Sequence, residues 1–403
     1  MLAKLFRLSN SQTLRSANEL WIIQREPFAT IHAKMMSASD DQKSIKEGEV
    51  MAKKLGAAIW GAGWVSGEHA KAWQNNPHSQ VVAIGSRKES SARALAERLG
   101  LDCKIYAHPD DPDKAYEQLL NDEQVDVISI CTPNDRHTHE AILAAKAGKH
   151  LVIEKPISLT LDELKALRDT IRETKVKTVV SFVLRWNPLF ETIKSLIAAG
   201  ALGDKLFYGE VDYWHHIDTW WSGWVWAHRK DSGGSAFLLG GCHAVDAVRW
   251  FMGSEVSEVT AYAHQWDTRF EYPPTVVAAL KFENGAVGKS STTFECRMPY
   301  NFNIDLLGNK GTFRYNGDKA MLWSETLNPK QTGWTILQTI YPDSGEVTHH
   351  PFQGEIDHFV DCILNDIESH CNVEDAVHTH EVCIACDISA AEGRPVQLPL
   401  LKD

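Results

Sequence analysis

The chain has 403 residues, 43% of them hydrophobic and 23% charged, and a chain of this length is expected to fold as two domains with separate cores. Its 41 basic and 53 acidic residues give a net charge of −12, which disfavours nucleic acids and anionic membranes as partners. No apolar run approaches the roughly 20 residues of a membrane span.

The eight cysteines are scattered, without the regular spacing of a disulfide scaffold. We therefore expect reduced thiols and a cytoplasmic protein. Cys383 and Cys386 form a C-x-x-C pair inside a helical pattern, with no second pair to complete a metal site. Such cysteines pack in a core more often than they bind zinc or exchange disulfides.

Residues 1–50 differ from the rest of the chain. They lack the continuous apolar core and the cleavage site of a secretory signal, whereas Lys4, Arg7 and Arg15 in an acid-free opening stretch weakly indicate a transit peptide. Met51 begins "MAKKLGAAIWGAG", which reads as a natural start just before a strand. We expect residues 1–50 to be a dispensable, poorly ordered leader.

From residue 53 to 184, short β-branched runs alternate with helical patterns. The predicted strands are "LGAAIW", "QVVAIGS", "KIYA", "VDVISICT", "HLVIEK" and "TVVSFV", and the predicted helices lie near 66–76, 89–99, 112–121, 135–148 and 160–175. This alternation predicts an α/β domain in which helices cover both faces of a parallel sheet.

From residue 185 to 403 the sequence pattern changes. It predicts long strands of alternating polarity between residues 205 and 341, followed by helices near 354–366 and 376–391. Turns at Glu283-Asn284-Gly285 and at 308–311 connect neighbouring strands closely. The pattern predicts a C-terminal α/β domain with a large, mostly antiparallel open sheet. Because such a sheet usually buries its second face, we expect a homodimer or homotetramer.

A glycine-rich loop, "GAGWVSGEHA", follows the first predicted strand. Gly61 suits the tight turn and Gly63 the close approach of a pyrophosphate, which the amides of the next helix would hold. Trp64 and Val65 belong to the same predicted cofactor-binding loop, and Ser66 stands where the third glycine of the motif is expected. The loop predicts a Rossmann dinucleotide-binding domain, although a tight turn without a ligand is also consistent with it.

The end of the second predicted strand, "AIGSRKES", distinguishes between dinucleotides. Folds that select NAD usually place an acidic residue here, on the ribose 2′-hydroxyl. This chain has Ser86, Arg87 and Lys88 instead, which suit a 2′-phosphate. NADP is therefore slightly favoured over NAD as the cofactor, and the alternative is a solvated basic turn.

Three motifs occur in one order: "GAGWVSGEHA", "ICTPNDRHTHEAILAAKAGKHLVIEKP" and "GGSAFLLGGCHAVDAVRW". With them the chain resembles the Gfo/Idh/MocA oxidoreductase family from about Lys53 to its C-terminus. The resemblance implies a Rossmann domain followed by an open-sheet α/β domain, with the active site between them.

The resemblance assigns a role to Glu154-Lys155-Pro156, which on its own reads as a solvated strand end. In the family this lysine lies beside the nicotinamide and hydrogen-bonds the reacting oxygen, so Lys155 is a candidate catalytic residue. Removal of hydride from an alcohol carbon requires the hydroxyl proton to be taken, which a desolvated lysine can do. Glu154 and Pro156 would fix its position, across a peptide bond that is a candidate for cis.

A second catalytic group is implied on a helix of the C-terminal domain, where the family has Asp, then His four residues later, then Asp three further on. This chain has Leu239, His243 and Asp246. His243 is the candidate acid or base, and Asp246 would orient it or contact the substrate. Leu239 cannot accept a side-chain hydrogen bond, so another group must replace the first aspartate.

The resemblance also places the turn after the fourth predicted strand beside the cofactor's ribose and nicotinamide. The cofactor-binding residues that it implies there are Cys131, Thr132, Pro133, Asn134 and His137. His137 and His139 lie two apart at a helix start and point in different directions, without a third ligand. We expect no metal.

Five tryptophans occur within 13 positions of "DYWHHIDTWWSGWVWAHRKDSGG": Trp214, Trp220, Trp221, Trp224 and Trp226. They suit either a core or subunit interface or a platform on which a sugar ring stacks. In the second interpretation the polar residues that bind hydroxyls are His215, His216, Asp218, His228 and Arg229, and Arg185 and Trp186 line the same cleft. A carbohydrate substrate is therefore predicted.

The leading functional prediction is an NAD(P)-dependent oxidoreductase that interconverts a secondary hydroxyl and a ketone on a sugar, polyol or glycoside. The second hypothesis is a glycosidase that transiently oxidises its substrate, eliminates the leaving group and re-reduces the product. A non-enzymatic, dinucleotide-sensing regulator of sugar metabolism is a third. The presence of both Lys155 and His243 argues against the regulator.

Overall fold

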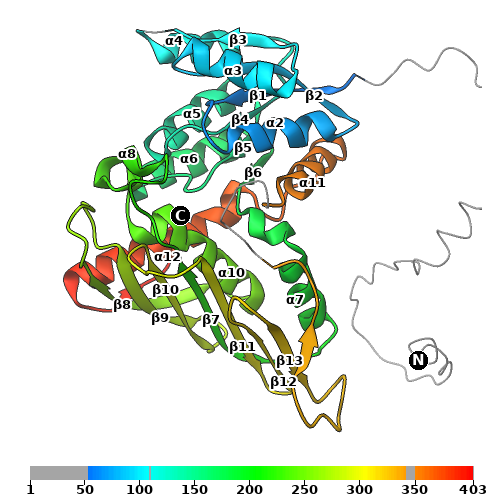
Figure 1. The fold of residues 1–403 in the computed structure, drawn as a ribbon, viewed down its shortest axis with the longest axis vertical. Coiled ribbons are helices and arrows are strands. Elements are labelled where there is room, and N and C mark those ends of the chain that lie inside the picture. The colour runs from blue at the N-terminus through cyan, green and yellow to red at the C-terminus, as the bar shows by residue number, and fades with distance from the viewer. Residues whose placement is uncertain (1–52, 109, 342–349, 403) are drawn as a thin grey trace, which may run out of the picture. The chain divides into compact units, whose positions relative to one another are not determined.

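The computed structural model describes residues 53–108, 110–341 and 350–402, and the predicted leader at 1–50 lies outside these described residues. Residues 53–403 form one compact unit. It is built around two sheets (Figure 1).

The first sheet is entirely parallel, with the strand order β3-β2-β1-β4-β5-β6. Its strands are β1 (Leu55–Trp60), β2 (Ser79–Gly85), β3 (Lys104–Tyr106), β4 (Val127–Ile130), β5 (His150–Ile153) and β6 (Thr178–Val180). The connecting helices are α2 (Ser66–Asn75), α3 (Glu89–Leu99), α4 (Pro112–Leu120), α5 (Asn134–Lys146) and α6 (Leu161–Thr174). The order reverses between β1 and β4, where folds of this kind bind a dinucleotide at the strands' carboxyl ends.

The last predicted strand of this domain is shorter than expected. It ends at Val180, because the chain turns as Phe182 N–H donates to Val180 O over 2.6 Å and continues as the 3₁₀-helix η1 (Val183–Trp186). The proposed boundary between residues 184 and 185 thus falls within η1.

Within the described residues, the second sheet has nine strands in the order β14-β13-β12-β11-β7-β10-β9-β8-β15. Only the central β7 and β10 pair is parallel, so the predicted open, mostly antiparallel sheet is confirmed. Its strands are β7 (Leu206–Trp214), β8 (Val256–His264), β9 (Thr275–Phe282), β10 (Val287–Thr293), β11 (Asn301–Gly308), β12 (Gly311–Tyr315), β13 (Ala320–Ser324), β14 (Thr335–Leu337) and β15 (Val396–Gln397).

Helices α10 (Cys242–Met252) and α12 (Val373–Glu392) lie against one face of the second sheet (Figure 1). Cys383 and Cys386 are fully buried on α12, as core packing predicts. The remaining helices are α7 (Pro188–Ala198), α8 (Trp224–Ala227), α9 (Lys230–Gly233), the π-helix η2 (Phe237–Gly241) and α11 (Phe352–Leu364). Among the described residues, no helix is both long enough and apolar enough to cross a membrane.

The two sheets are tied together by the end of the chain. Helix α11 packs against α2 of the first domain, where the Asn76 side-chain amide donates to Asp357 Oδ1 over 2.7 Å. Helix α12 contacts both α6 and β8. A cleft between the sheets is therefore held by helices at the far end of the sequence.

Close packing at the end of β2 generates a stability prediction. A Cβ added at Gly85 would lie 2.2 Å from Cε3 of the buried Trp60 ring, which packs on Tyr116 with 4.5 Å between ring centroids. Gly85→Ala should therefore lower the free energy of unfolding by about 1–3 kcal/mol, measured by urea denaturation. A Cβ at Gly333 meets nothing within 4 Å, so Gly333→Ala is the control. Equal unfolding midpoints for the two variants would contradict the packing argument.

Candidate active site

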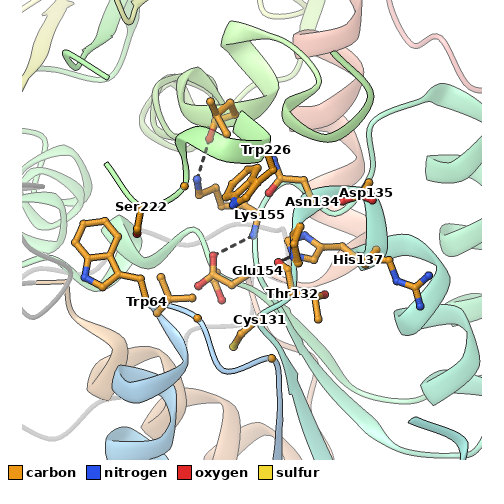
Figure 2. Close-up of a pocket in the computed structure, with 18 of the residues that line it drawn as sticks. Trp64, Cys131, Thr132, Asn134, Asp135, His137, Glu154, Lys155, Ser222 and Trp226 are labelled. Atoms are coloured by element: carbon orange, nitrogen blue, oxygen red, sulfur yellow. Dashed lines mark hydrogen bonds between the residues drawn. The ribbon is translucent and has the colours of Figure 1, made fainter. Parts of the chain in front are cut away.

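A cavity of about 750 Å³ opens between the carboxyl ends of the first sheet's strands and the elements of the second domain (Figure 2). The first domain contributes the residues after β1, β2, β4 and β5. The second contributes the end of β7, the segment 221–226, η2 and the start of α10. The predicted cofactor loop and the two predicted catalytic side chains all line this cavity.

The glycine-rich loop closes one end of the cavity. Gly61 has φ of 111°, and a Cβ there would lie 2.5 Å from Cys131 O, so the turn requires glycine. At Gly63 an added Cβ would approach only Cys131 O, at 3.9 Å, so its backbone is open to a ligand. The buried Ser66 accepts a hydrogen bond from Gly63 N–H over 3.0 Å, which shows why serine can replace the third glycine. Trp64 and Val65 also line the cavity.

The basic turn after β2 lines the same end of the cavity. Ser86, Arg87 and Lys88 all contribute, and among the described residues neither Arg87 nor Lys88 forms an ion pair. Arg136 differs, because Asp113 and Glu140 neutralise it. Arg87 and Lys88 are the cations left to bind an anion here.

The turn between β4 and α5 brings Cys131, Thr132, Pro133, Asn134 and His137 to the cavity. The buried His137 ring joins two loops, with Nδ1 2.7 Å from Pro156 O and Nε2 2.7 Å from Thr132 O. His139 is exposed. Among the described residues, no group of three or more His, Cys, Asp or Glu side chains is arranged to hold a metal ion.

The Glu154-Lys155-Pro156 turn is not a solvated strand end. Glu154 is buried and accepts hydrogen bonds from His69 Nε2 over 2.9 Å and from Lys155 N–H over 3.3 Å. Burial raises the pKa of Glu154, but the hydrogen bond and charge of His69 and the charge of Lys155 outweigh it and leave the pKa below its usual range. The Lys155–Pro156 peptide bond is cis. The carboxylate thus fixes the backbone that carries Lys155 (Figure 2).

Lys155 and His243 meet across the cavity from different domains. Lys155 Nζ donates to the backbone carbonyl of Leu239 over 2.9 Å. The His243 ring stacks on Tyr213 with centroids 6.1 Å apart, and its Nδ1 has no hydrogen-bond partner among the described residues. Burial, and then the charges of Lys155 and His350, hold the pKa of His243 well below its ordinary value. At neutral pH His243 is therefore uncharged and able to accept a proton.

Three residues predicted to bind substrate lie elsewhere, and they correct the sequence interpretation. Asp246 accepts two hydrogen bonds from Arg185, over 2.9 and 2.5 Å, and neither residue lines the cavity. Arg185 also donates to Asp375 over 2.5 Å. Trp186 packs against the rings of His358 and His370, which also contact each other. The buried guanidinium needs these acceptors, so Asp246 neither orients His243 nor faces substrate.

The tryptophan segment divides between the cavity and other surfaces. Of the five tryptophans only Trp221 and Trp226 line the cavity, together with His215. Trp214 donates to Ser291 Oγ on the opposite face of the sheet from Tyr213, and Trp224 stacks on His228 with Arg269 above it. The predictions of Trp214 and Trp224 as substrate-binding residues are therefore not supported.

Several cavity residues escaped the sequence interpretation: Tyr213, Ile217, Ser222, His350 and Phe352. Alternation along β7 was the available signal for Tyr213, because adjacent side chains on a strand point to opposite faces. Tyr213 Oη lies 3.2 Å from His215 Nδ1. Burial, with the charges of His216, Lys155 and His350, lowers the pKa of His215 to about 4.

Comparison with known proteins gives matches along nearly the whole unit. A model of an oxidoreductase family's NAD-binding Rossmann fold matches residues 55–182, and a model of an oxidoreductase family's C-terminal alpha/beta domain matches residues 194–398. The chain is 27% identical over 353 residues to the scyllo-inositol 2-dehydrogenase (NAD(+)) of Bacillus subtilis (strain 168), covering 86% of this chain and 97% of that protein.

It is 24% identical over 382 residues to the D-apiose dehydrogenase of Paraburkholderia graminis, covering 91% of this chain and 96% of that protein. A solved levoglucosan dehydrogenase in complex with NADH and L-sorbose superimposes with a TM-score of 0.76 at 23% identity, covering 87% of this chain and 100% of that one. At that identity the structural likeness supports the fold alone.

The Arg185 ion pairs generate a prediction that separates stability from chemistry. Asp246→Asn should lower the free energy of unfolding by about 3 kcal/mol, because it leaves a buried guanidinium short of one negative charge. Asp305 pairs with Arg314, whose side chain is half exposed, so Asp305→Asn should cost less than about 1 kcal/mol. Urea denaturation of both variants measures the difference. Equal losses would mean that the buried network contributes no more than a surface pair.

Proposed function

Since the chain belongs to the Gfo/Idh/MocA family of oxidoreductases, which act on CH–OH groups, we propose that it oxidises a secondary hydroxyl of a sugar or polyol, or reduces the corresponding ketone, with NAD(P). The observation that carries this proposal is the convergence of Lys155 and His243 on the cavity lined by Gly61 and Gly63. A regulator that only senses a dinucleotide does not need these two side chains.

The residues present fit a dinucleotide. The open backbone at Gly63 and the N-terminus of α2 suit a pyrophosphate, and the turn at 131–134 suits the ribose and nicotinamide side. Bound there, the nicotinamide supplies the hydride acceptor or donor. The remaining requirements are the positioning of the reacting carbon, the handling of one proton and the stabilisation of charge on the reacting oxygen.

Lys155 and His243 divide the handling of the proton and the stabilisation of charge between them. In the oxidation direction the hydroxyl proton leaves as the hydride leaves carbon, and neutral His243 can accept it. The Lys155 ammonium has three N–H donors, of which one is held by Leu239 O. The others can hydrogen-bond the substrate oxygen and stabilise the negative charge that develops on it.

The walls of the second-domain half favour a carbohydrate. Trp221, Trp226 and Tyr213 supply aromatic surface, which packs on the C–H face of a sugar ring. His215 and Ser222 supply the few polar groups that orient hydroxyls. The names of the relatives, dehydrogenases of an inositol, of apiose and of levoglucosan, indicate the same substrate class.

Glycoside cleavage with recycling of the cofactor is the second candidate. It requires a base beside the sugar in addition to the redox pair, and the Tyr213 and His215 contact in the same cavity favours it. A panel of sugars, polyols and glycosides, followed by nicotinamide absorbance and by release of the aglycone, separates the two. Net cofactor turnover supports the dehydrogenase, and aglycone release without net turnover supports cleavage.

The cofactor preference gives a prediction. We expect NADP(H) to bind more tightly than NAD(H), and Arg87→Ala to weaken NADP(H) binding roughly tenfold or more while changing NAD(H) binding within about twofold, because the guanidinium bonds the 2′-phosphate. Fluorescence titration of both reduced cofactors measures this. Arg93 pairs with Glu89 and does not line the cavity, so Arg93→Ala should change neither. An equal effect of Arg87→Ala on both cofactors would refute the assignment.

The proposed catalytic pair, Lys155 and His243, gives a second prediction. Lys155→Ala should lower turnover by roughly 10² to 10⁴ while leaving cofactor binding nearly intact, and His243→Ala should behave similarly. Because both groups act on one oxygen, the double variant should lose much less than the product of the single losses. Steady-state kinetics with cofactor titration test this. Turnover of Lys155→Ala within about twofold of wild type would remove Lys155 from the active site.

A further inference from the structure

The Lys155 amine donates a hydrogen bond to a backbone atom, Leu239 O. Leu239 lies in the middle of the π-helix η2 (Phe237–Gly241), directly before α10. A π-turn widens the helix and breaks the regular ladder of backbone hydrogen bonds, so a carbonyl can turn to a side chain. The turn therefore presents an acceptor to the cavity that a regular α-helix would keep within its own ladder.

Two glycines seat this turn against the sheet. A Cβ at Gly240 would lie 2.7 Å from the Tyr213 ring. A Cβ at Gly241 would lie 2.8 Å from Phe237 and 2.9 Å from Thr292 Cβ. Because any larger residue would push the turn off the sheet, Gly240 and Gly241 set the position of the Leu239 carbonyl.

Among the described residues, the second domain contributes no carboxylate to the cavity lining. Among the described residues that line it, the carboxylates are Asp135, Glu140 and Glu154, all from the first domain. Glu154 is engaged by His69 and by the Lys155 backbone. The charge of Lys155 lowers the pKa of five neighbouring groups: Glu154, His215, Cys242, His243 and His380. The acceptor opposite the amine is thus neutral.

We propose that the Leu239 carbonyl, presented by η2, is the positioning group that holds Lys155 toward the reacting oxygen, in place of a side-chain carboxylate at position 239. The inference rests on the proposed function for its catalytic meaning. A neutral acceptor orients the ammonium but does not neutralise it. The full positive charge of Lys155 therefore stays available to the developing oxyanion.

The first experiment measures the amine itself, in the protein without cofactor or substrate. Acetic anhydride acetylates only the neutral amine, so labelling of the Lys155 peptide across pH, read by mass spectrometry, reports how strongly its charged form is stabilised. Leu239→Asp places a carboxylate on the residue that already contacts the amine. It should raise the pH at which Lys155 becomes reactive by about one unit or more relative to the isosteric Leu239→Asn. Superimposable labelling curves for these two variants would overturn the proposal.

The second experiment moves the carbonyl without adding charge. Gly241→Ala should displace η2, so Lys155 should lose its acceptor and label differently from wild type. The turnover number of the Gly241→Ala variant should fall tenfold or more, with the KM changed by less than threefold. Gly333→Ala is the matched control. A folded Gly241→Ala protein that labels and turns over as wild type would overturn the proposal. If Gly241→Ala does not fold, the two Leu239 variants still decide.

Failure of the proposed function is distinguishable from failure of this inference. A wild-type protein that turns over no sugar, polyol or glycoside refutes the proposed function, yet the labelling difference between Leu239→Asp and Leu239→Asn is measured without turnover. Conversely, normal turnover with identical labelling curves refutes the positioning role alone.

Discussion

The buried ion pair between Arg185 and Asp246 is the constraint on which the geometry of the site depends. Arg185 lies in η1, directly after the last strand of the first sheet, and Asp246 lies on α10, so the pair ties that helix to the segment that joins the two domains. His243 is one turn earlier on α10 and lines the same cavity as Lys155, which follows β5. Breaking such a pair lowers the free energy of unfolding, because it leaves an unpaired charge buried away from water. A rigid framework suits side chains that must act on one substrate oxygen.

The electrostatics of the cavity follow from the same burial. The pKa values of His215 and His243 are both lowered, first by burial and then by neighbouring positive charge that includes Lys155. The cavity therefore holds two uncharged imidazoles, those of His215 and His243, near the Lys155 amine. This arrangement can take up a proton and stabilise an oxyanion at neutral pH, which are the two requirements of reversible hydride transfer at a hydroxyl-bearing carbon.

The tryptophans of the segment 214–226 have different surroundings in the folded protein. Trp221 and Trp226 line the cavity, whereas Trp224 stacks on His228 and contacts Arg269, and Trp220 is 61% exposed. Aromatic enrichment therefore indicated the right region without indicating which rings touch a ligand.

The parts of this protein that could be predicted from sequence are those governed by local rules. The α/β alternation, the turn at Gly61 and the strand end before Lys155 depend on residues close together in the chain, and the family and fold class inferred from them are confirmed. The partners of Asp246 and the contact of Lys155 with the Leu239 carbonyl depend on residues 61 to 133 positions apart. Only tertiary packing decides these, because a buried charge or amine takes whichever acceptor the folded chain brings within reach, and the sequence does not reveal which one that is.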